Sequence, residues 1–161
     1  MDNKYQEKLN AANKQMQNAQ YLLDHTYKLA NDPKVLMSVL IKVNEAYSLA
    51  IASLIYRDKD VKLISNFHDS EKSRMDLFTR KCVKRYSFEK QDVSTINELK
   101  EIIEDHKNSS VEFSRKKELV ICDSKFKFKK VSIDTVKKFM DAAKSFVYKI
   151  EKIIQLNTFK S

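Results

Sequence analysis

Basic residues gather in the last third of this 161-residue sequence, at spacings that suit contacts with phosphate groups. One group is a run of three, and the other alternates with phenylalanine in the stretch KFKFK. In an extended strand, alternate side chains lie roughly 6–7 Å apart on one face, close to the spacing of phosphates along a nucleic-acid strand. The candidate phosphate-binding residues are Arg115, Lys116, Lys117, Lys125, Lys127 and Lys129.

The net charge of +9 is concentrated in the same region. Residues 110–161 carry 13 Lys or Arg against 6 Asp or Glu, whereas the rest of the chain is nearly balanced. A local basic excess indicates an anionic partner, and RNA or another polyanion is the partner that we expect. Two other interpretations stay open, because lysine also solvates any surface and protects exposed edge strands from aggregation.

A second basic group lies in a predicted helix in the middle of the chain. Arg74, Lys81 and Arg85 are spaced by 7 and 4 residues, which places them on one helical face. They could support the phosphate contacts, or they could form an ordinary solvated face with weak ion pairs.

No pattern in the sequence indicates a catalytic, metal or cofactor site. The histidines His25, His68 and His106 fall on separate predicted elements, and the two cysteines have no metal-ligand spacing. His68 precedes Asp69, which could orient it as a general base, but no nucleophile can be placed beside it. A hydrolase or nuclease that uses His68 is therefore only a remote alternative to a non-enzymatic role.

Composition excludes several other classes of protein. The sequence contains no glycine and one proline, so phosphate-cradling glycine loops and dinucleotide-binding folds are excluded. We find no apolar run of about 18 residues and no signal-peptide core, and we expect a cytoplasmic protein without membrane contact.

The spacing of apolar residues predicts a mainly α-helical, single-domain bundle of about five helices with one short β-hairpin. The first two helices should form an antiparallel helical hairpin, because only a short break at Asp32-Pro33 separates them. The predicted elements are the helical hairpin 2–56, helices 69–86 and 92–106, a β-hairpin near 118–130, and a closing helix 132–156.

The first helix carries a narrow apolar seam with alternating steps of three and four residues, as in coiled coils. Such a seam fits one partner helix, either in the same chain or in a second copy. A protein–protein interaction or homodimerisation module is therefore the alternative function. The seam consists of Leu9, Ala12, Met16, Ala19 and Leu23.

The β-hairpin is predicted with Asp123-Ser124 as its loop. A two-residue loop, or a four-residue loop of the same parity, places Phe126 and Phe128 on one face with the apolar residues of the first strand. This face would pack on the bundle, and the lysines would line the opposite face.

The order of a long antiparallel helix pair, shorter helices and a long closing helix resembles the HEPN-type helical bundles. Catalytic members of that group carry an arginine followed four to six residues later by a histidine. In this sequence Arg57 precedes His68 by eleven residues, and His68 stands before Arg74. The resemblance therefore implies a non-catalytic member that associates with RNA or with a partner protein.

Overall fold

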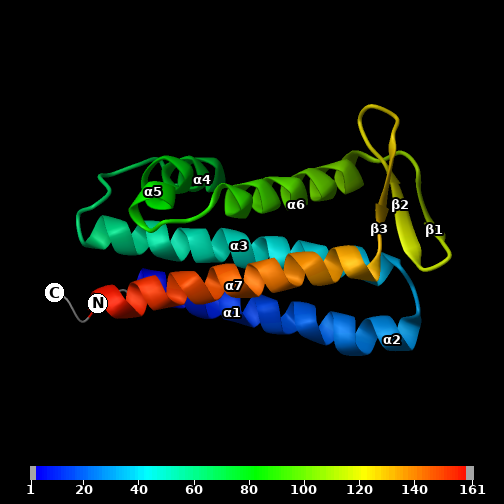
Figure 1. Cartoon of the computed structure of the whole chain (residues 1–161), viewed down its shortest axis with the longest axis horizontal. Helices are drawn as coiled ribbons and strands as arrows, with labels where there is room; N and C mark the ends of the chain where they lie inside the picture. The colour runs from blue at the N-terminus through cyan, green and yellow to red at the C-terminus, as the bar shows by residue number, and fades with distance from the viewer. Residues whose placement is uncertain (1–2, 159–161) are drawn as a thin grey trace.

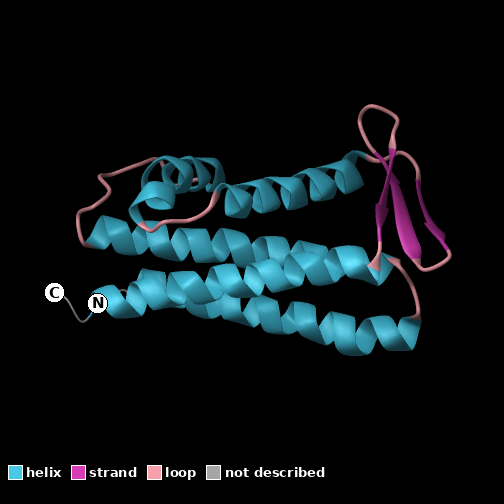
Figure 2. Cartoon of the chain, viewed as in Figure 1, coloured by secondary structure: helices cyan, strands magenta, loops and turns pink. Residues whose placement is uncertain are grey.

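The long helices lie side by side along the molecule, and a small sheet closes one end of the bundle (Figure 1). The computed structural model describes residues 3–158, which form five helical stretches and one sheet. Figure 2 shows the helices and the strands by colour. In chain order the elements are α1 (Lys4–Tyr21), a π-helical turn (Leu22–Thr26), α2 (Tyr27–Ala30), α3 (Lys34–Asp60), α4 (Glu71–Leu77), a π-helical turn (Phe78–Cys82), α5 (Val83–Arg85), α6 (Lys90–Asn108), β1 (Glu112–Arg115), β2 (Glu118–Cys122), β3 (Phe128–Val131) and α7 (Ile133–Thr158).

The central helix is α3, which packs against α1, α6 and α7. The mainly α-helical fold predicted from the sequence is therefore confirmed, and the predicted helix start at Asp2 lies outside the described residues. By length and composition alone α3 could cross a membrane, and in this fold it is the helix that the others surround.

Periodic apolar faces on α3 and α7 form the core, as predicted. On α7, Phe146 packs between Tyr47 of α3 and the rings of Phe78 and Phe88, with ring centroids 5.0–5.6 Å apart. Each fully buried side chain of this size contributes about 1.5–3 kcal/mol relative to its exposed state. This cluster therefore joins the π-helical turn between α4 and α5, and the segment between α5 and α6, to α3 and α7.

Side-chain caps set several helix boundaries. The hydroxyl of Ser132, the residue at which the closing helix is predicted to begin, accepts a hydrogen bond from the N–H of Thr135 at 3.2 Å and so caps that helix. At the start of α6, Glu89 and Asp92 form a reciprocal capping box, so that this helix begins two residues before the predicted Asp92. Helix α3 continues four residues beyond the predicted end at Tyr56.

The sheet has three antiparallel strands in the order β1-β2-β3, and β2 lies against α6 and α3. The strand β1 was not among the predicted elements, and it lies between the predicted helix 92–106 and the predicted β-hairpin near 118–130. The predicted hairpin register is wrong, because Cys122 pairs with Phe128 and Ile121 pairs with Lys129. The loop between these strands comprises the five residues 123–127, and an odd loop length reverses the faces expected for two or four residues.

The consequence of this register is that the phenylalanines do not dock on the bundle. Phe126 is 86% exposed and Phe128 is 60% exposed, whereas Leu119 and Ile121 are buried as predicted. Lys129 lies on the inner face of the sheet with these two residues, and Phe128 lies on the outer face.

Candidate nucleic-acid interface

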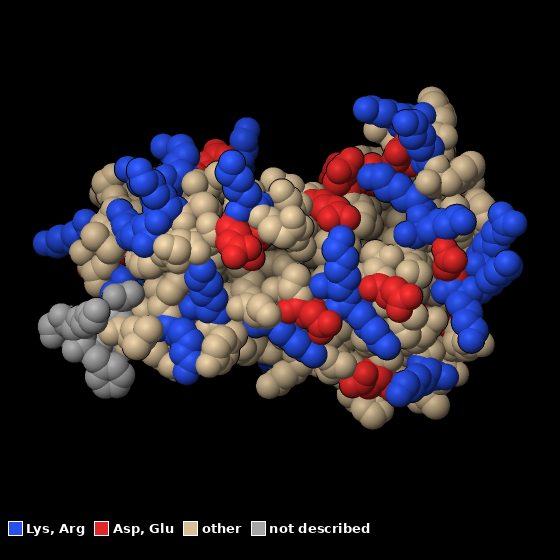
Figure 3. All heavy atoms as spheres, viewed as in Figure 1, with Lys and Arg blue, Asp and Glu red and all other residues tan. Residues whose placement is uncertain are grey.

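The outer face of the sheet, turned away from the helices, combines basic and aromatic side chains. The strand pairing places Phe113, Val120 and Lys130 in one row across the sheet and Arg115 opposite Glu118 in the next. Phe128, at the start of β3, lies on the same face. The centroid of its ring lies 6.1 Å from that of the Phe113 ring. Figure 3 shows that Lys and Arg side chains gather over this end of the molecule.

Six exposed cations lie on the strands of the sheet and on the turn and loop that join them, and we call these six the basic sheet end. Within residues 3–158 none of the six forms an ion pair, so their charges are available to a ligand. One member, Lys130, was missed in the sequence analysis because it follows the alternating stretch. The basic sheet end consists of Arg115, Lys116, Lys117, Lys125, Lys127 and Lys130.

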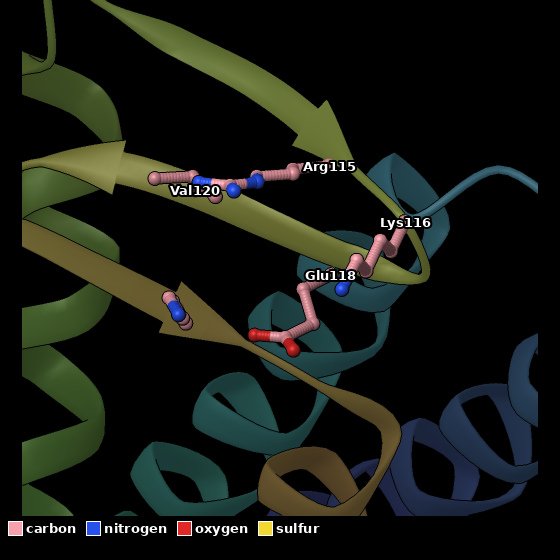
Figure 4. A pocket seen from close by; sticks show the side chains of 5 residues that line it. Arg115, Lys116, Glu118 and Val120 are labelled. Carbon is pink, nitrogen blue, oxygen red and sulfur yellow. The ribbon is translucent and has the colours of Figure 1, made fainter.

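A small pocket opens among these residues. It has a volume of about 130 Å³ and is lined by Arg115, Lys116, Glu118, Val120 and Lys130. Figure 4 shows Arg115 reaching from β1 over β2 toward Val120, which is only 4% exposed. With three cations and one carboxylate in its lining, the pocket can hold a small anionic group such as a phosphate.

Asp123 holds the loop that carries Lys125 and Lys127. Its carboxylate accepts hydrogen bonds from the backbone N–H groups of these two lysines, at 2.9 and 2.8 Å. These bonds lower the pKa of Asp123 below its ordinary value, and the bond from Lys127 has the largest effect. The loop is therefore closed by its own backbone contacts, and both lysine side chains point to solvent.

Lys129 differs from the other lysines of the hairpin because it is engaged within the fold. Its ammonium group lies 2.6 Å from the carboxylate of Asp105 and 3.3 Å from that of Glu101, both on α6. Desolvation lowers the pKa of Lys129, but hydrogen bonds to Asp105 and Glu101 outweigh it, so that the pKa is raised. An inward-pointing charge on an edge strand is also a known protection against edge-to-edge pairing.

Replacing Lys129 by glutamine is expected to lower the free energy of unfolding by about 1–2 kcal/mol, because Asp105 is left nearly buried without its cation. Since the pKa of Lys129 is raised, its stabilisation is fully present below the ordinary value of 10.5 and is lost as pH rises through the folded value. Urea denaturation measures the free energy of unfolding of Lys129→Gln and of the matched control Lys127→Gln. Equal effects of the two substitutions would contradict the assignment.

The second basic group lies at the opposite end of the bundle from the sheet (Figure 1). Arg74 donates a hydrogen bond to Asp69 at 2.5 Å, and Arg85 donates one to Asp58 at 3.2 Å. Lys81 is exposed and forms no ion pair among the described residues. The structure does not bring these three residues together with the basic sheet end.

Asp58 is the centre of a buried polar cluster that the sequence analysis missed. Its side chain is fully buried and accepts hydrogen bonds from Tyr86 at 2.7 Å and from Arg57 and Arg85 at 3.2 Å. The thiol of Cys82 lies 3.8 Å away. Burial, and then the charge of Asp58, raise the pKa of this thiol to about 12, so it stays protonated at neutral pH. The cluster ties the end of α3 to α5.

A signal for Asp58 was present in the sequence. It follows Leu54 by four residues and Ile51 by seven, so it continues the apolar face of α3. The predicted helix ends at Tyr56, because the next four residues are charged, and Asp58 therefore falls outside the predicted elements.

His68 has no side-chain partner among the described residues, and it is exposed. The carboxylate of its neighbour Asp69 instead accepts hydrogen bonds from Tyr56 at 2.6 Å and from Arg74. The bond from Tyr56, and then that from Arg74, lower the pKa of Asp69 despite desolvation. In the part of the chain that the structure describes, no three His, Cys, Asp or Glu side chains gather as metal ligands would.

The apolar seam of the first helix lies inside the molecule. All five of its residues are buried in the hydrophobic core, and α1 packs along α3 of the same chain.

No protein-family model, curated protein or solved structure matches this sequence. The functional conclusions therefore rest on the geometry of the sheet end.

Proposed function

We propose that this protein is a non-enzymatic binding module that holds RNA through its phosphates at the basic sheet end. One observation carries the proposal: the six exposed cations of the basic sheet end lack ion-pair partners among the described residues, and three of them line a pocket. Phosphate contacts from lysine and arginine supply the sequence-independent part of nucleic-acid affinity.

Protection of sheet edges explains only part of this charge. Arg115 and Lys130 lie on the edge strands, but Lys116 and Lys117 lie in a turn and Lys125 and Lys127 in a loop. Four of the six cations therefore stand where there is no strand edge to protect. The carboxylates of Glu118 and Asp123 lie beside these cations. That of Asp123 already accepts hydrogen bonds from the backbone of the loop.

The alternative of a homodimerisation module depended on the apolar seam of the first helix. Because that seam is buried against α3 of the same chain, no observation favours a second copy as its partner.

Binding of a labelled, unstructured RNA of about 12 nucleotides tests the proposal at two salt concentrations. We expect binding at about 50 mM salt and a loss of affinity of about a hundredfold or more at about 200 mM, because several counterions are released. Fluorescence anisotropy measures both values. Absence of binding at the lower concentration would contradict the proposal.

A further inference from the structure

Three phenylalanines are exposed among the cations of the sheet end. Phe113 is 41% exposed, Phe128 is 60% exposed and Phe126 is 86% exposed. The rings of Phe113 and Phe128 meet edge to face across β2, with 6.1 Å between their centroids. A cluster of exposed apolar side chains commonly marks an interaction surface.

Phe126 is held in a conformation that is unfavourable for its residue type. Its φ angle is +61°, in the left-handed region, where bulky side chains are rare outside glycine-like turn positions. The carboxylate of Asp123 accepts hydrogen bonds from the backbone N–H groups of Lys125 and Lys127, on either side of Phe126. These bonds keep the conformation of Phe126 in place. The fold gains no buried contact from Phe126, so both its strain and its exposure point to a role outside the fold.

We infer that the exposed rings of Phe113, Phe126 and Phe128 stack with unpaired bases, so that the ligand is single-stranded RNA. The inference rests on the proposed function and specifies its ligand. Aromatic side chains bind nucleic acid by stacking on bases, and these are accessible in single strands but not within a duplex. The phosphates of a duplex could bind the lysines, but its paired bases would leave all three rings exposed to water.

The order of side chains supports a polynucleotide strand over other anionic partners. Cations and rings alternate along Lys125-Phe126-Lys127-Phe128, so both rings of this segment have a cation beside them in the chain. A polynucleotide likewise presents one base and one phosphate in each unit.

A tryptophan at position 126 reports stacking directly, because the protein contains no other tryptophan. We expect an unstructured 12-nucleotide RNA to quench the fluorescence of Phe126→Trp, and an RNA duplex of equal phosphate number to leave it unchanged. Equal quenching by both RNAs would overturn the inference. A blue shift with anionic phospholipid vesicles, without quenching by RNA, would overturn it in favour of a lipid surface.

Affinities of leucine variants give the second measurement, with circular dichroism to confirm that they fold. We expect Phe126→Leu and Phe128→Leu each to weaken binding of the single strand about tenfold and binding of the duplex hardly at all. The matched control is Tyr148→Leu on α7, where a ring that is 59% exposed lies 5.1 Å from the ammonium group of Lys152. This control should bind like the unchanged protein.

The outcomes separate this inference from the proposed function. Salt-sensitive binding of both RNA forms, unchanged by the leucine substitutions, would overturn base stacking and leave phosphate binding standing. If neither form binds at about 50 mM salt, the proposed function fails, and the inference fails with it.

Discussion

Replacing Asp58 by alanine is expected to lower the free energy of unfolding by about 3–5 kcal/mol. The carboxylate is fully buried, and its removal leaves the Arg57 side chain, only 10% exposed, without its counter-charge. The hydroxyl of Tyr86, 2.7 Å from this carboxylate, also loses its acceptor. Urea or guanidinium denaturation followed by circular dichroism measures the change.

Asp60 provides the matched control for this substitution. It lies two residues further along, at the end of α3, where it is exposed and forms no ion pair with any described residue. Asp60→Ala should therefore change stability by no more than about 0.5 kcal/mol. If the two alanine variants were equally stable, the cluster around Asp58 would not hold α5 on α3 as described.

Neutralising the run Arg115-Lys116-Lys117 with glutamine is expected to weaken binding to single-stranded RNA about a hundredfold at low salt. These residues supply three of the six cations of the basic sheet end, and two of them line its pocket. All three are exposed, so their replacement should leave the fold intact. Fluorescence anisotropy with a labelled RNA measures the change in affinity.

The control for this triple variant removes the same charge at the other end of the bundle. Lys72, Lys81 and Lys84 are exposed and lack ion pairs within the described part of the chain. Their replacement by glutamine lowers the net charge equally but leaves the sheet untouched. An equal loss of affinity in both triple variants would show that net charge, or the α4–α5 end, governs binding.

The sequence predicted the helical core well because the pattern there is long and regular. On α7, apolar residues recur from Val136 to Ile154 with helical spacing, and a face of this length admits one secondary structure. The same spacing runs from Leu36 to Leu54 on α3, and these residues lie in the core. Caps then fixed helix ends to within a few residues, as Ser132 did for α7.

The sheet was harder to predict because its register depends on the length of a loop, and no turn motif in the sequence indicates that length. Without glycine, the left-handed positions of the turns fall to other residues, here Lys116 and Phe126. Neither residue type marks such a turn in a sequence. The pairing of Lys129 with Asp105 is equally hidden, because the two residues lie on elements whose relative placement only the fold determines.

The candidate site was therefore found in part. Five of the six cations of the basic sheet end were named from their spacing, and Lys130 was not. The rings of Phe126 and Phe128 were predicted to pack on the bundle, because phenylalanine in an alternating pattern is most often buried. Their exposure follows from the five-residue loop, whose odd length turns Phe128 outward.

The salt dependence of RNA binding tests the central claim most directly. Six phosphate contacts to a single strand predict that the logarithm of the association constant falls with the logarithm of salt concentration with a slope of about −4. For the Arg115-Lys116-Lys117 glutamine variant the slope should shrink to about −2, because three contacts are lost. A slope near zero, or the same slope for both proteins, would contradict binding of RNA phosphates at the basic sheet end.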